Sequence, residues 1–126
     1  MKISDIRRYD SEKMYESYEK WPEIAQENYK KDLSKLQFRN IEHIVFAGVG
    51  GSGTIGDVIS SILSKTNIHV NVVKGYLLPK TVGPNTLVVT TSVSGNSKES
   101  LSILQNAKKS EGKFVAFSSG GKMKKF

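Results

Sequence analysis

The feature that most constrains this chain is a change of apolar pattern at about residue 41. From there on, short runs rich in β-branched residues alternate with segments whose apolar residues recur at three- and four-residue spacing. The runs are typical of buried strands, and they lie at 43–47, 68–73, 86–91 and 114–117. The intervening segments at 54–63 and 97–109 are typical of helices. Because strands that alternate with helices form parallel sheets, the sequence predicts an α/β fold, a three-layer sandwich with helices on both faces of a parallel sheet.

The first part of the chain lacks this alternation. We therefore expect an N-terminal helical segment at residues 1–40 and the sandwich domain at residues 41–126. The first part has nine Lys or Arg and eight Asp or Glu residues, whereas the second has ten against four, within a net charge of +7. A basic second part suits an anionic ligand, either a phosphate group or a nucleic acid. Basic and aromatic residues are not interleaved along the predicted strands, so no nucleic-acid partner is expected.

Two helices are expected in the N-terminal segment. Asp10 and Ser11 are typical caps of a first helix that ends near Trp21. Pro22 suits the first position of a second helix, which runs to about Gln37, because that position needs no N–H donor. The first helix carries an apolar stripe, for which packing on the sandwich domain and binding of a partner are alternative interpretations: Met14, Tyr15, Tyr18 and Trp21.

Composition disfavours several classes of protein. The chain has no cysteine, which excludes disulfides and thiolate chemistry. No apolar run approaches the roughly 18 residues that a membrane-spanning helix needs. The first residues, MKISDIRRYDSEK, lack the apolar segment of a secretory signal. We therefore expect a cytoplasmic protein without a membrane partner.

The end of the chain is unusual for this pattern. The sequence GGKMKKF follows the fourth predicted strand closely, where a phosphate-binding α/β domain normally continues with a further strand and helix. We expect that the last strand is missing or that a partner chain covers the sheet, because an exposed apolar edge promotes aggregation. Three lysines near the end are interpreted as a solvated tail: Lys122, Lys124 and Lys125.

The first predicted strand is followed by GVGGSG at 48–53, which we call the glycine loop. Small residues let the backbone approach a ligand closely, and the following helix directs free N–H groups and its positive dipole end toward that ligand. The loop also matches the dinucleotide pattern G-x-G-x-x-G, which requires an acidic residue about twenty positions later. The second strand ends in Val73-Lys74-Gly75 instead. A dinucleotide is therefore the weaker alternative, with Lys74 facing the 2′-phosphate of NADP.

A second loop, SVSGNS at 92–97, follows the third predicted strand and is called the serine loop. It places three hydroxyl groups at a strand-to-helix turn, those of Ser92, Ser94 and Ser97. Asn96 and Glu99 have the spacing of a capping box, which fixes the start of the following helix. Hydroxyl and helix N–H groups supply a phosphate with many donors and no buried charge. Because ligands of open α/β sheets bind at the carboxyl ends of strands, where both loops lie, the two loops together predict a phosphate site.

Four segments make the chain similar to the N-terminal part of the archaeal bifunctional phosphoglucose/phosphomannose isomerases, which contain sugar isomerase (SIS) domains. The segments are GVGGSG at 48–53, KGYLLP at 74–79, LVVTTSVSGNSKESL at 87–101 and SSGGK at 118–122. That family typically reads GMGGSG, SYSGNT-x-E-T and TSGG at three of these places. Val93 stands where the family has Tyr, and Ser97 keeps the hydroxyl of the usual Thr. The resemblance covers about residues 10–126.

The resemblance implies an isomerase that interconverts glucose 6-phosphate or mannose 6-phosphate with fructose 6-phosphate. It implies an enzyme with two SIS domains, each with a sheet of five parallel strands. It also implies that the enzyme is a homodimer. It also implies that the sugar phosphate is held by Gly51, Ser52, Ser92, Ser94 and Ser97. We expect no cofactor and no metal ion.

Isomerisation needs groups that open the sugar ring, move a proton between C2 and C1 and stabilise the enediolate. In the family these groups are a Glu, a His, an Arg and a Lys that lie beyond the point where this chain ends. Within the chain, His43 and His69 are interpreted as structural. Glu99 is interpreted as a helix cap, and Asp57 as a complement to a helix dipole. We therefore expect the phosphate-binding, N-terminal portion of an isomerase, inactive alone; the alternative is a non-catalytic SIS module that senses a sugar phosphate.

Overall fold

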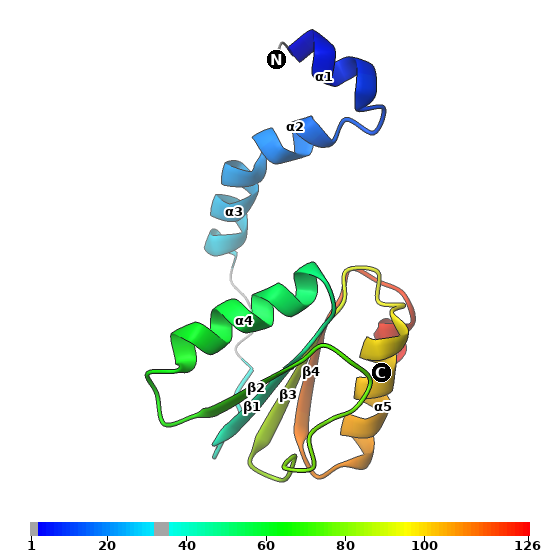
Figure 1. Cartoon of the computed structure of the whole chain (residues 1–126). Helices are drawn as coiled ribbons and strands as arrows, with labels where there is room; N and C mark the ends of the chain where they lie inside the picture. Colours follow the sequence, from blue (N-terminus) through cyan, green and yellow to red (C-terminus); the bar gives the residue numbers. More distant parts are fainter. Residues whose placement is uncertain (1–2, 32–35) are drawn as a thin grey trace. The chain divides into compact units, whose positions relative to one another are not determined.

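The computed structural model describes residues 3–31 and 36–126 (Figure 1). The chain divides into two compact units, Met1–Gln37 and Phe38–Phe126. In the described residues the first unit is helical, and the second contains the sheet. Among the same residues, no helix combines the length and the apolar character needed to cross a membrane.

The first unit consists of α1 (Ile3–Tyr9), α2 (Met14–Glu19) and α3 (Trp21–Lys30). The sequence pattern does not predict α1, and α2 begins at Met14, later than the expected caps Asp10 and Ser11. Asp10 nevertheless satisfies the first turn of α2, because its Oδ2 atom accepts a hydrogen bond of 2.8 Å from the Tyr15 N–H. The expected cap therefore acts from a position several residues before the helix.

Helix α3 includes Pro22 in its first turn, as expected, and ends before the predicted limit at Gln37. Residues 32–35 of that predicted helix lie outside the described part of the chain. In the apolar stripe, the rings of Tyr18 and Trp21 pack edge to face with centroids 4.7 Å apart. Both side chains are more than half exposed. The two interpretations of this stripe remain predictions.

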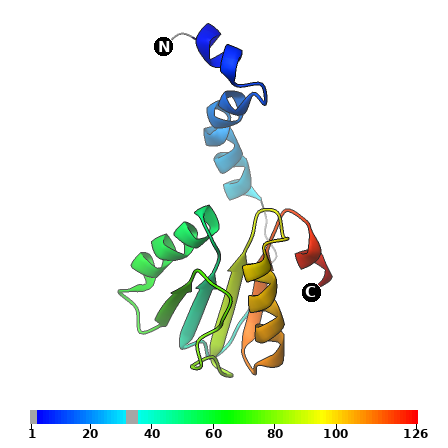
Figure 2. The ribbon, with the colours of Figure 1, turned by 45° about the vertical axis from the view of Figure 1, so that its right-hand side comes forward.

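The second unit contains a four-stranded parallel sheet in the order β2-β1-β3-β4 (Figure 2). Its strands are β1 (His43–Ala47), β2 (His69–Val73), β3 (Thr86–Thr91) and β4 (Lys113–Phe117). Its helices are α4 (Gly51–Leu63), α5 (Lys98–Lys109) and the 3-10 helix η1 (Lys122–Lys125). Helix α4 packs on β1 and β2 from one face, and α5 packs on β3 and β4 from the other (Figure 1). The predicted three-layer α/β fold is confirmed.

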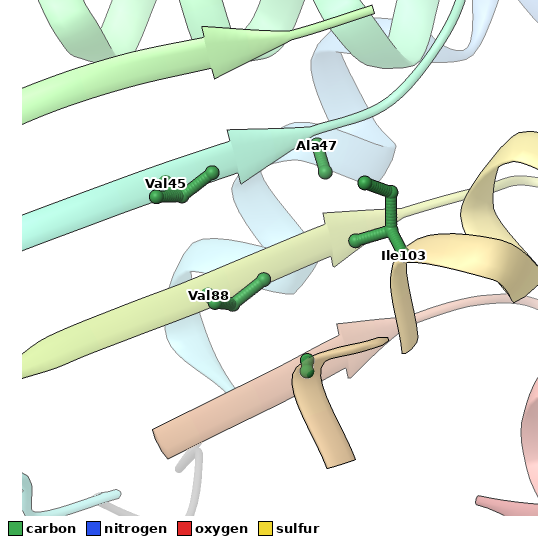
Figure 3. Close-up of a cluster of buried hydrophobic side chains, with 5 residues drawn as sticks. Val45, Ala47, Val88 and Ile103 are labelled. Atoms are coloured by element: carbon green, nitrogen blue, oxygen red, sulfur yellow. The ribbon is translucent and has the colours of Figure 1, made fainter. Parts of the chain in front are cut away.

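The core lies between the sheet and α5 (Figure 3). Val45 and Ala47 of β1 and Val88 of β3 pack against Ile103 and Ala107 of α5. These side chains come from alternate strand positions because successive residues of a strand point to opposite faces. The connection from β2 to β3 completes this face without a helix, and contributes Leu78 and Val82 to the core. A segment of bends and turns therefore takes the place of the helix that parallel crossovers usually contain.

Helix α4 packs on the opposite face through glycine. A Cβ atom at Gly56 would lie 2.9 Å from the Phe46 Cβ and 3.2 Å from the Val72 Cγ1. By contrast, Ile55 and Val58 on the same helix are more than half exposed. The apolar spacing thus predicts the helix correctly, but the residues that bring it close to the sheet are glycines.

This packing predicts that Gly56→Ala lowers the free energy of unfolding by about 1–3 kcal/mol, because the new methyl group overpacks the contact with Phe46. Alanine is the better helix former, so an uncrowded site would show the opposite sign. Urea unfolding followed by circular dichroism measures the change. Ser61→Ala, at an exposed position of the same helix, is the control and should stay within about 0.5 kcal/mol. A stabilising Gly56→Ala would contradict the close packing.

Candidate functional site

The glycine loop and the serine loop lie side by side at the carboxyl end of the sheet. The glycine loop connects β1 to α4, and the serine loop connects β3 to α5. Strands β1 and β3 are neighbours in register, with Ala47 opposite Thr90, so the two loops leave the sheet at the same level. Each loop leads into the N-terminus of a helix, which adds unpaired N–H groups and positive potential.

A pocket of about 520 Å³ separates the two loops. It is lined by Val49, Gly51, Ser52, Ile55, Thr91, Ser92, Val93, Ser94 and Ser97. The structure therefore brings all five predicted site residues to one cavity, although they come from two loops about forty positions apart. The lining side chains are hydroxyl-bearing or aliphatic, and none of them is ionisable. Such a surface can hold an anion through hydrogen bonds without a charged side chain.

The glycine loop enters its helix earlier than predicted. Helix α4 begins at Gly51 instead of Thr54, and Gly50 is its N-cap, with a positive φ of 59°. The Gly50 carbonyl accepts the N–H groups of Gly53 and Thr54 at 3.0 and 3.1 Å. The N–H groups of Gly51 and Ser52 have no acceptor in the described part of the chain, as expected for a first helical turn. Both residues line the pocket.

A chain of hydroxyl groups orders the serine loop. The Ser97 hydroxyl donates to Ser100 at 2.8 Å, and the oxygens of Ser92 and Ser97 lie 3.2 Å apart. Because a hydroxyl has one proton, Ser92 must donate to Ser97. Ser92 is buried and also accepts the Gly95 N–H at 3.2 Å. Ser94 is exposed, so of the three predicted serines it offers its hydroxyl to a ligand most directly.

The predicted capping box is wrong. The N-cap of α5 is Ser97 rather than Asn96, and the Ser97 side chain makes no capping hydrogen bond. The Glu99 carboxylate instead accepts a hydrogen bond of 2.9 Å from the Tyr76 hydroxyl. Its own backbone N–H and Tyr76 lower the pKa of Glu99, and the carboxylate raises the pKa of Tyr76. Glu99 thus fixes the segment after β2 to the start of α5.

The remaining ionisable candidates lie away from the pocket lining. Asp57 has a cation partner that the sequence does not reveal, because the Lys74 Nζ lies 2.6 Å from its Oδ2. Lys74, the residue that would face the 2′-phosphate of NADP in the dinucleotide alternative, is therefore already paired with a carboxylate. His43 bonds Asn71 through Nε2 at 2.8 Å and lies 3.2 Å from the Thr86 Oγ1 through Nδ1, which fits a structural role. In the described residues, no three His, Asp or Glu side chains gather around a possible metal site.

The sequence interpretation misses one element beside the site. The segment after β4, treated as a solvated tail, forms η1 and packs under the serine loop (Figure 2). Met123 is only 4% exposed, and its N–H donates to the Gly95 carbonyl at 3.1 Å. The lysine side chains are exposed as expected. A methionine among lysines was the available signal, because a purely solvated tail needs no apolar residue.

The chain is similar to several known proteins. The SIS domain model matches residues 37–122. The bifunctional phosphoglucose/phosphomannose isomerase of Caldicellulosiruptor bescii is 38% identical over 117 residues, which are 90% of this chain and 34% of the relative. The protein of the same name from Aquifex aeolicus is 37% identical over 114 residues, 89% of this chain and 32% of the relative. The D-glucosamine-6-phosphate 4-epimerase of Sulfolobus acidocaldarius is 31% identical over 108 residues, 85% of this chain and 33% of the relative.

Solved structures show the same fold. A Salmonella typhimurium protein described as a phosphosugar isomerase matches with a TM-score of 0.56 and 21% identity, over 66% of this chain and 27% of that one. A Bacillus subtilis protein with the same description matches with a TM-score of 0.58 and 23% identity, over 69% and 28%. The chain spans about one third of the length of the curated relatives named above. Since the SIS domain model covers well over half of its residues, the chain belongs to the SIS domain family.

Proposed function

We propose that the pocket between the two loops binds the phosphate group of a sugar phosphate, and that the chain is the substrate-holding portion of a phosphosugar isomerase. The observation that carries this proposal is the convergence of Gly51, Ser52, Ser92, Ser94 and Ser97 on one cavity. Two helix N-termini face the same space, so free N–H groups and both dipoles favour a dianion there. Both loops belong to the region that the family model matches.

The proposed substrates are glucose 6-phosphate and mannose 6-phosphate, with fructose 6-phosphate as the product. The names of the Caldicellulosiruptor bescii and Aquifex aeolicus relatives support these hexoses. The name of the Sulfolobus acidocaldarius relative indicates glucosamine 6-phosphate instead. A phosphorylated sugar is common to these names, and the phosphate is the part that this pocket suits.

Proton transfer is proposed to need groups from outside this chain. Ring opening and transfer between C2 and C1 require an acid and a base beside the sugar. The pocket lining provides hydroxyl and aliphatic groups only. The chain spans about a third of its relatives, which leaves room in those proteins for the missing groups. We also propose that the protein is cytoplasmic and acts as a homodimer.

The same lining favours one alternative, a non-catalytic module that senses a sugar phosphate. Such a module would bind the phosphate as proposed and transmit the bound state to a partner. The two functions share the binding step and differ in turnover once the missing groups are supplied. An assay of a longer protein that contains this chain separates them.

Fructose 6-phosphate is expected to raise the thermal stability of the 126-residue chain. A ligand that binds the native state stabilises it by about 2.7 kcal/mol at a hundred times its dissociation constant. Ser94→Ala should weaken binding by about tenfold or more, because it removes a hydroxyl donor to a charged group. Calorimetric titration measures the affinity. Ser61→Ala and free fructose are the matched controls, and equal affinity of Ser94→Ala and the unaltered chain would contradict the proposed site.

The chain alone is expected to bind glucose 6-phosphate and mannose 6-phosphate without converting them. The reason is that its pocket lining offers no acid or base for the proton transfer. A coupled assay for fructose 6-phosphate, run at substrate concentrations that saturate binding, measures any conversion. Turnover that disappears in Ser94→Ala would show that this chain does supply the catalytic groups.

A further inference from the structure

The direction of the carbonyl groups in the serine loop decides whether the loop attracts or repels an anion. N–H groups attract phosphate oxygens, whereas carbonyl oxygens that face the same space repel them. In this structure every carbonyl from residue 92 to residue 95 accepts a hydrogen bond from within the protein. The donors, in the order of the carbonyls, are the Gly95 N–H at 3.2 Å, the Ser119 N–H at 3.2 Å, the Asn96 Nδ2 at 3.1 Å and the Met123 N–H at 3.1 Å.

Two of these donors belong to residues 118–123, the segment after β4 that we call the C-terminal turn. Ser119 donates both its N–H and its hydroxyl to the Val93 carbonyl. Met123, which donates to the Gly95 carbonyl, is held by its buried side chain. The turn therefore bonds the serine loop at Val93 and at Gly95, and the buried Met123 side chain anchors the second of these contacts.

Asn96 joins the serine loop to the same turn. Its Oδ1 atom accepts the Lys122 N–H at 3.1 Å, while its Nδ2 donates to the Ser94 carbonyl. With the carbonyls engaged, the N–H groups of Val93 and Ser94 have no acceptor among the described residues. Both residues line the pocket. The loop thus keeps its acceptors bonded within the protein, while two of its pocket-lining residues have N–H groups without a partner among the described residues.

The loop and the turn touch through their backbones. A Cβ atom at Gly95 would lie 1.9 Å from the Gly120 carbonyl oxygen, and one at Gly121 would lie 2.3 Å from the Ser94 carbonyl oxygen. Both glycines have positive φ, 64° and 70°, which other residues adopt at a cost. At Gly120, by contrast, a Cβ atom would meet nothing within 4 Å. A side chain at Gly121 therefore forces the serine loop and this turn to shift relative to each other, whereas one at Gly120 meets no neighbour.

We propose that the C-terminal turn and Asn96 are positioning elements for the phosphate site. They hold the carbonyls of the serine loop in internal hydrogen bonds, so that its N–H groups are left for the anion. The inference rests on the proposed function, because it assigns to these residues an effect on phosphate affinity. It differs from a structural role, in which the turn would stabilise the fold and leave the affinity of the folded protein unchanged.

The test compares Gly121→Ala with Gly120→Ala in the full 126-residue chain. Fructose 6-phosphate and inorganic phosphate are titrated separately by calorimetry, with circular dichroism to establish that each variant is folded. Gly121→Ala is expected to lower the affinity for both ligands by about tenfold or more, because that is the effect of losing one hydrogen bond to a charged group. Gly120→Ala is expected to bind like the unaltered chain. Equal affinity in a folded Gly121→Ala would overturn the inference.

Asn96→Ala provides a second variant, which decides the matter if Gly121→Ala does not fold. It releases the Ser94 carbonyl and the Lys122 N–H together, and its expected effect is again a weaker phosphate affinity with an altered amide shift of Ser94 in ¹⁵N spectra. Asn67→Ala, at an exposed position before β2, is the matched control. A lower melting temperature with unchanged affinity would show a structural role only. Failure of the unaltered chain to bind either ligand would instead sink the proposed function, and the inference with it.

Discussion

The parallel pairing of β1 with β3 is the constraint on which the rest of the site depends. The strands run in register from His43 opposite Thr86 to Ala47 opposite Thr90, so their carboxyl ends finish together. Each strand then opens into a loop and the N-terminus of a helix, on opposite faces of the sheet. Two sets of N–H groups without an acceptor among the described residues consequently lie at one cavity. A slip of one residue between the strands would turn every side chain to the other face and separate the loops.

Small residues allow the close approach of neighbouring backbone segments in this arrangement. Gly56 lets α4 lie close to Phe46 on β1, and the contact between Gly95 and Gly121 lets the serine loop rest on the turn after β4. The serines then provide internal order as well as donors, because Ser92 is buried and bonded to Gly95. The site is therefore built from backbone groups whose directions are set by neighbouring loops. Among the described residues, none of those that line the pocket has a charged side chain.

Regular elements with strong apolar patterns could be predicted closely, and irregular ones could not. Each strand lies within one residue of its predicted range, because a short β-branched run bounded by loop residues is typical of a buried strand. Helix α4 begins before its prediction because Gly51 and Gly53 have poor helix propensity, which packing overrides. The capping box fails because Asn96 bonds Lys122 of the C-terminal turn, a partner distant in sequence. Periodicity also gives no sign that the lysine-rich end packs under the serine loop.

The central claim is that one anion contacts both loops at once. The most direct measurement is a ¹H–¹⁵N NMR titration of the labelled chain with fructose 6-phosphate. The account predicts that the amide signals of Gly51 and Ser52 in one loop and of Val93 and Ser94 in the other shift along the same binding curve. Shifts confined to one loop, or shifts centred at the opposite end of the sheet around His43, would contradict it.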